Sequence, residues 1–207
     1  MISKFAFAGS VAALSVAGVV FATAGTAVPA VTAVTPAAGA PVGAAVNYKV
    51  DPVHSYVMFK IKHDNIGSNY GSFVGPTGSF SWSGDSPESS SLDISVRSES
   101  VSTGNSKRDD HLKSGDFFDA KQFPTISFKS KSAKKLDGGK IEFTGDLTLL
   151  GKSKSVTVVA APVGQTEKGA GIETTFTIKR TDFGMSKMTD RLSDEVTLTV
   201  ALEGGKQ

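Results

Sequence analysis

Residues 196–202 read VTLTVAL, in which Val196, Leu198, Val200 and Leu202 alternate with threonine and alanine. Successive side chains of a β-strand point to opposite faces, so a period of two indicates one buried face and one face in water. A strand of this kind is typical of antiparallel sheets, because parallel sheets are usually buried on both faces. The segment therefore predicts an antiparallel β fold.

The same alternation recurs from residue 48 onward, in runs that turn-forming, glycine-containing clusters separate at 83–85, 137–139, 150–152 and 168–171. About eight strands with short connections predict a closed barrel or a sandwich, and no strand–helix–strand unit is visible. The apolar positions of the other runs are Val57, Phe59 and Ile61; Phe80 and Trp82; Leu92, Ile94 and Val96; Ile126 and Phe128; Ile141 and Phe143; Leu147 and Leu149; Val156 and Val158; and Ile172, Phe176 and Ile178.

The alternation is interrupted between Val101 and Phe123, where charges cluster; residues 108–130, which read RDDHLKSGDFFDAKQFPTISFKS, lead from this interruption into the next strand. Ser106 and Asp109 have the spacing of a capping box, which predicts a short helix over 107–113 that ends at Gly115. Aromatic side chains in a charged loop must cover something apolar. The aromatic residues of this segment are Phe117, Phe118 and Phe123. Their rings could lie across a barrel mouth, enter the barrel, or simply fill the core beneath a long loop.

The first 24 residues have the pattern of an export signal. Lys4 precedes an apolar run over residues 5–21, and Ala22-Thr23-Ala24 offers the small-x-small pattern of a cleavage site. An uncleaved membrane anchor is the alternative, because the run approaches spanning length. In both cases the domain is expected outside the cytoplasm, either periplasmic or secreted.

Residues 25–46 form a Pro/Ala-rich stretch without charge or period. Pro29, Pro36 and Pro41 interrupt any helix, so we expect a semi-extended linker. Residues 47–207 then form a single domain.

Charge and cysteine content narrow the possible partners. Removing Lys4 from the 22 basic residues leaves 21 in the remainder of the chain, against 20 acidic ones. This balance gives no electrostatic reason to expect nucleic acid as a partner. With no cysteine present, disulfides, thiolate metal sites and a lipidated cysteine are excluded.

Several separated motifs resemble, in the same order, those of the YceI-like family of bacterial lipocalin-like, polyisoprenoid-binding proteins. They are YKVDPVHS at 48–55, RDDHL at 108–112, DFFD at 116–119, Phe123-Pro124, GDLT at 145–148 with Gly151, Arg180, FGM at 183–185 and SDEV at 193–196. The chain departs from the family where a Gly-Phe-Phe-Gly pattern is usual. It has Gly71, Phe73, Pro76 and Gly78 there, so Pro76 replaces the second aromatic residue.

The resemblance implies an eight-stranded antiparallel lipocalin-like barrel with a short helical excursion near residues 106–119. It implies binding, and sequestration or transport, of a polyprenol or isoprenoid quinone in an apolar cavity, with no cofactor beyond this cargo. Transient membrane contact and a homodimer remain open. The residues expected to line or close the cavity are Phe59, Ile61, Phe73, Phe117, Phe118, Phe123, Phe128, Phe143, Leu149, Phe176 and Ile178.

Charged residues of the motifs allow two interpretations. They could fix the excursion over the barrel through hydrogen bonds and ion pairs, or contact a polar head group. We favour the structural role, because an apolar cavity needs few polar contacts. The residues concerned are Arg108, Asp109, His111, Asp119 and Arg180.

Catalysis and metal binding have weaker support. His54, His63 and His111 are too irregularly spaced for a recognisable metal motif. No serine lies in a Gly-x-Ser-x-Gly elbow, although His111 with Asp110 or Asp119 could form a general base. We therefore expect a binding protein rather than an enzyme. A barrel filled by its own side chains, acting as an interaction or stress-response module, is the other alternative.

Overall fold

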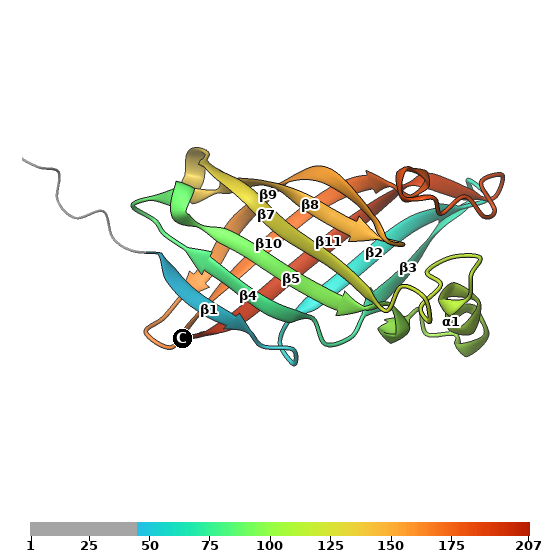
Figure 1. Cartoon of the computed structure of the whole chain (residues 1–207), viewed down its shortest axis with the longest axis horizontal. Helices are drawn as coiled ribbons and strands as arrows, with labels where there is room; N and C mark the ends of the chain where they lie inside the picture. The colour runs from blue at the N-terminus through green and yellow to red at the C-terminus, as the bar shows by residue number, and fades with distance from the viewer. Residues whose placement is uncertain (1–44) are drawn as a thin grey trace, which may run out of the picture. The chain divides into compact units, whose positions relative to one another are not determined.

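The computed structural model describes residues 45–207, which form an antiparallel β-barrel with one short α-helix (Figure 1). The predictions of a signal peptide and of most of the linker fall outside these residues. Within the described residues, no helix has the length and apolar character needed to span a membrane. The elements are β1 (Val46–Val50), β2 (Tyr56–His63), β3 (Gly67–Phe73), β4 (Thr77–Trp82), β5 (Ser91–Arg97), β6 (Val101–Ser102), α1 (Ser106–Lys113), β7 (Thr125–Lys135), β8 (Ile141–Leu149), β9 (Lys152–Gln165), β10 (Gly169–Lys179) and β11 (Leu192–Lys206), with 3-10 turns at Pro87–Ser89, Ser98–Ser100, Asp137–Gly139 and Arg180–Phe183.

The barrel is closed by strand β11, which pairs with β10 on one side and with both β1 and β2 on the other. The order β1-β4-β5-β7-β8-β9-β10-β11 returns to β1, which makes eight strands. Gly204 to Lys206 of β11 pair with β1, whereas Leu192 to Ala201 pair with β2. The prediction of an eight-stranded antiparallel barrel is confirmed, and the sandwich alternative is not what the chain forms.

Three of the eight wall strands are interrupted once each, and this accounts for the three additional strands. The first wall strand consists of β1 and β2, which both pair with β11. The second consists of β4, which pairs with β1, and β3, which pairs with β2. The third consists of β5, which pairs with β4, and β6, which pairs with β3. Each pair of short strands is thus one wall strand with a break. An up-and-down arrangement of this kind leaves every wall strand with two neighbours.

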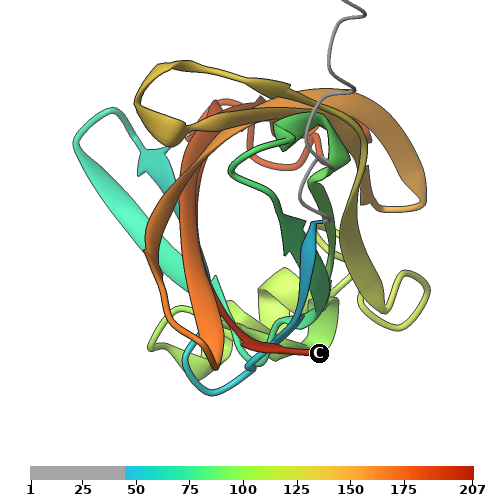
Figure 2. The same ribbon diagram turned by 90° about the vertical axis from the view of Figure 1, so that its left-hand side faces the viewer.

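The two ends of the barrel differ. β1 begins and β11 finishes at one end, seen face-on in Figure 2, and α1 lies at the opposite end (Figures 1 and 2). We call these the closed end and the mouth. The largest hydrophobic cluster occupies the closed end and contains Tyr48, Phe80, Trp82, Ile141 and Phe143.

Helix α1 confirms the predicted excursion, with its boundary shifted by one residue. Asn105, not Ser106, is the N-cap, because its Oδ1 accepts a hydrogen bond from the Arg108 backbone N–H at 3.0 Å. Asparagine is a good N-cap for the same reason as serine, since its short side chain reaches the free N–H groups of the first turn. No residue of α1 is buried. The helix is therefore a surface element, which packs on the barrel through the half-buried Leu112.

Candidate functional site

An apolar cavity of about 460 Å³ runs inside the barrel from the mouth toward the closed end. The volume falls within the range of small-molecule sites, roughly 300–1,000 Å³. The inward-facing side chains of the strands form most of its wall, as the alternation predicted. Those that line it include Val57, Leu92, Ile94, Val96, Ile126, Leu147, Val158, Ala160, Ile172, Val196, Leu198, Val200 and Leu202.

Most of the residues singled out from the sequence lie on this wall. They are Phe59, Ile61, Phe73, Phe117, Phe118, Phe128, Leu149, Phe176 and Ile178.

Two of the predicted lining residues lie elsewhere. Phe143 points inward but is fully buried at the closed end, with its ring centroid 6.3 Å from that of Trp82. The ring of Phe123 lies against Gly151 in the β8–β9 turn, so closely that an added Cβ there would be 2.8 Å from the ring. Alternation shows which face a side chain occupies but not how far along the barrel axis it lies.

Aromatic rings close the wall near the mouth. The ring centroids of Phe59 and Phe73 are 5.9 Å apart, and that of Phe118 meets Phe73 edge-on at 5.3 Å. Gly71 makes room for this group, because a Cβ at that position would lie 2.3 Å from the Phe59 ring. Pro76, which replaces the family's second aromatic residue, lies between β3 and β4. It is fully buried and does not line the cavity.

Polar side chains reach the cavity wall at the mouth. Arg108 donates from Nε to the Thr103 hydroxyl at 2.7 Å and from Nη2 to the Thr103 carbonyl at 2.9 Å. Asp109 accepts from the Thr103 backbone N–H and hydroxyl, at 2.8 and 2.6 Å, and does not itself line the cavity. We use the name rim for the polar residues that line the cavity at the mouth, which are His63, Asn69, Thr103, Arg108 and His111.

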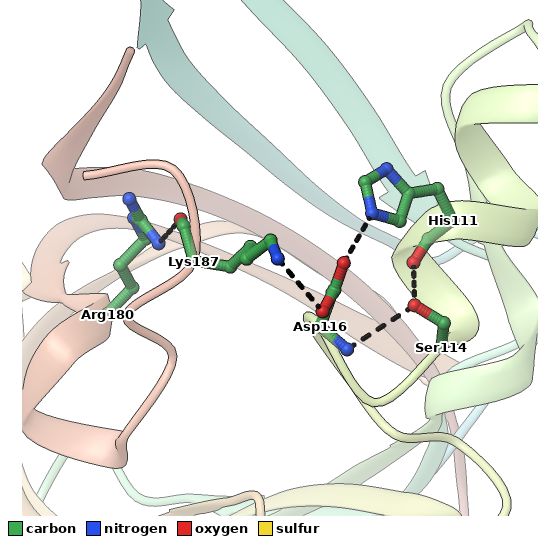
Figure 3. Close-up of polar contacts among 5 residues, drawn as sticks. All are labelled: His111, Ser114, Asp116, Arg180 and Lys187. Carbon is green, nitrogen blue, oxygen red and sulfur yellow. Dashed lines mark hydrogen bonds and ion pairs between the residues drawn. The ribbon is translucent and has the colours of Figure 1, made fainter. Parts of the chain in front are cut away.

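An ion-pair chain, which we call the strap, links α1 to the segment before β11 (Figure 3). His111 Nε2 lies 2.9 Å from Asp116 Oδ2, and Lys187 Nζ lies 3.4 Å from Asp116 Oδ1. The hydrogen bond from His111, with the charge of Lys187, holds the pKa of Asp116 below its usual range. The three side chains are half exposed, so the strap is weak and screened by salt.

Arg180 binds the backbone of the segment before β11, which contains Lys187. Its guanidinium donates to the carbonyls of Met185, Lys187, Leu192 and Ser193 at 2.8–3.2 Å, and the Lys187 contact is drawn in Figure 3. The side chain is only 2% exposed, and burial lowers its pKa. With four donors engaged by backbone carbonyls, Arg180 fixes the loop, which is the structural role favoured from the sequence.

The histidines are paired with aspartates in ways the sequence only partly indicated. His54 bonds Asp51 at 2.8 Å, and His63 lies 3.3 Å from Asp64. His111 pairs with Asp116 rather than with Asp110 or Asp119. Asp119 instead has a φ of 41° and accepts the N–H groups of Gln122 and Phe123 on its carbonyl. Among residues 45–207, no group of three His, Asp or Glu side chains has the geometry of a metal site.

Sequence reasoning missed Asn69 and Thr103 on the rim, and Asp116 and Lys187 in the strap. Asp116 carried a usable signal, since it lies in the charged segment that leaves α1. Lys187 carried none, because it reaches Asp116 only through the fold.

Comparisons with known proteins agree with this geometry. Protein YceI of Escherichia coli O157:H7 is 36% identical over 170 residues, which cover 79% of this chain and 88% of that protein. The crystal structure of Burkholderia cenocepacia BcnA gives a TM-score of 0.70 at 26% identity, covering 74% of this chain and 98% of BcnA. A polyisoprenoid-binding domain from Saccharophagus degradans, implicated in plant cell wall breakdown, shares the fold, with a TM-score of 0.61 at 13% identity over 78% of this chain and 99% of that domain. A model of the YceI-like domain family matches residues 48–204, and the chain therefore belongs to the YceI-like domain family.

Proposed function

We propose that the barrel binds an isoprenoid-type amphiphile, a polyprenol or an isoprenoid quinone, with its tail in the cavity and its head group at the rim. The observation that carries the proposal is the distribution of polarity along one cavity. Most of the wall is apolar, although Ser95, Ser127, Glu173 and Thr174 also line it, and the five polar residues of the rim gather at the mouth. A related fold in Saccharophagus degradans is described as polyisoprenoid-binding, which supports this choice of cargo.

The energetics favour a slim apolar chain. Burial of each CH₂ equivalent contributes about 0.8 kcal/mol, so a few isoprene units suffice for tight binding. Ordering a flexible chain opposes part of this gain. Aromatic side chains along the wall, such as Phe59, Phe128 and Phe176, offer flat surfaces to the planar double bonds of the cargo.

The rim suits a neutral or weakly acidic head group. Arg108 and His111 supply donors there, while Asp109 does not line the cavity. The export pattern of residues 1–24 supports a location outside the cytoplasm, where the barrel would shield an insoluble tail in water. We therefore propose sequestration or transport of the lipid, without chemical conversion.

A charge placed on the wall tests the proposal. Phe176→Asp would put a carboxylate into the cavity, whereas Thr177→Asp, its matched control, places the same group on the exposed outer face of β10. Fluorescence titration with an isoprenoid quinone should show binding by the parent and by Thr177→Asp. Phe176→Asp, shown to be folded by circular dichroism, should lose it, because burying an unpaired carboxylate is costly. Equal binding by the two folded variants would refute the assignment of the cavity.

A further inference from the structure

The cavity stops well before the closed end of the barrel. On β10 and β11 the last lining residues are Ile172 and Leu202, and the next inward positions, Ala170 and Gly204, do not line it. Leu92 on β5 and Ala160 on β9 are the corresponding last residues on their strands. We call these four residues, Leu92, Ala160, Ile172 and Leu202, the floor.

Four aromatic rings pack beside and beyond the floor; we call them the aromatic plug, and they are those of Tyr48, Phe80, Trp82 and Phe143. Tyr48 and Phe143 are 0% exposed and Phe80 is 1% exposed. The rings of Tyr48 and Phe80 stack with centroids 5.1 Å apart. No space remains between them and β11, because a Cβ on Gly204 would lie 2.7 Å from the Phe80 ring and 2.9 Å from the Tyr48 Cβ.

The plug is also anchored at its outer side. Gln165 Nε2 donates a hydrogen bond to the Tyr48 hydroxyl at 2.9 Å, which satisfies the polar tip of a fully buried ring. Close-packed interiors yield little to an added methylene, so a chain that reaches the floor cannot push further. The floor is therefore a fixed stop.

We infer that the distance from the rim to the floor sets the longest isoprenoid tail that the cavity encloses, with Ala160 and Leu202 as specificity-determining residues. The inference rests on the proposed function and adds a limit on the class of cargo. Up to the stop, each further CH₂ equivalent that enters the cavity should tighten binding about fourfold. Beyond it, added units remain in water at the mouth and add nothing.

Two floor variants move the stop in opposite directions. Leu202→Ala removes side-chain volume from the floor and should allow a longer tail. Ala160→Leu adds volume at a fully buried position that faces the cavity and should shorten it. Leu149→Ala is the matched control, since Leu149 has nearly the same exposure as Leu202, 6% against 5%, but lines the mouth half.

The test uses the purified protein and a homologous series of isoprenoid quinones, each one isoprene unit longer than the last, with Kd measured for every member. For the parent, affinity should rise with tail length and then level off at one member. This levelling point should move to a longer member in Leu202→Ala, to a shorter one in Ala160→Leu, and stay in place in Leu149→Ala.

The outcomes separate the two claims. If the series binds and the levelling point is the same in all four proteins, the length limit is wrong while lipid binding stands. If no member binds to the parent, the proposed function fails, and the length limit fails with it. The larger side chain of Ala160→Leu extends into the cavity, so we expect this variant to fold. It can therefore test the length limit by itself if Leu202→Ala unfolds.

Discussion

The closed end and the mouth of this barrel are stabilised by different forces. The aromatic plug consists of buried rings that pack in two pairs, Tyr48 with Phe80 and Trp82 with Phe143. The mouth has a buried cluster of its own, around Phe117, Phe183 and Met185, but it adds polar contacts. Helix α1, which has no buried residue, is tied there by Thr103 and the strap, and the segment before β11 is fixed by the carbonyl contacts of Arg180. Apolar packing depends little on pH and on the screening of charge by salt, whereas exposed charge pairs respond to both. The two ends should therefore differ in rigidity and in their response to salt and pH.

The largest expected effect comes from truncating the plug. Phe143→Ala should lower the free energy of unfolding by about 3–5 kcal/mol, because a fully buried ring leaves a cavity that cannot collapse. Phe118→Ala, the same truncation at the partly exposed mouth, should cost distinctly less. Denaturant unfolding of both variants measures the contrast. Equal losses would contradict a rigid closed end and a loose mouth.

Arg180 is the exception at the mouth, since it is buried there. Arg180→Met should cost about 2–4 kcal/mol, because four backbone carbonyls lose their donor. Hydrogen exchange should rise mainly in residues 184–193. Arg191→Met is the control, since that arginine is exposed and its ion pair with Asp64 should add little. A loss of protection spread evenly over the barrel would show that Arg180 does not act locally.

Two neighbouring glycines provide a finer test of the plug. Gly204→Ala introduces a methyl group where the rings of Phe80 and Tyr48 leave no room, and should cost about 1–3 kcal/mol. Nothing lies within 4 Å of a Cβ at Gly205, so Gly205→Ala should be neutral or slightly stabilising. Thermal unfolding of the pair is sufficient. A tolerated Gly204→Ala would mean that the plug has free volume.

The smallest effect is the acid response of the strap. The pKa of Asp116 is lowered in the fold, so the stability it provides is present above the ordinary aspartate pKa and is lost as the pH falls through the lowered value. Nuclear magnetic resonance signals of residues 111–119 should shift in that acidic range, while those of β4, which contains no acidic residue, should change little. Asp116→Asn should abolish the shift. Its persistence in that variant would assign it to another group.

The sequence predicted the fold better than the site. Period-two alternation depends on neighbouring residues alone, so it identified the strands and the inward faces of residues such as Phe59 and Phe176. It could not tell that Phe143 packs against Trp82 and does not line the cavity, because axial position depends on the shear of the whole barrel. The same limit applies to Phe123, which packs on a turn formed by Gly151.

Partners between distant segments were also beyond sequence reasoning. The pairing of His111 with Asp116 depends on how the chain turns after α1, and the contact with Lys187 depends on closure of the barrel. The motif residue Arg180 was recognised, but its four carbonyl acceptors come from a loop whose shape no local pattern encodes.

The most direct test of the central claim is native mass spectrometry of the protein purified from the cells that make it, followed by solvent extraction of the sample. If the barrel carries such a lipid, we expect a stoichiometric mass increment that disappears on extraction and yields a polyprenyl species, a polyprenol or an isoprenoid quinone. A protein that carries no lipid, and that takes up neither class of lipid when they are added, would contradict it and favour an interaction role for the barrel.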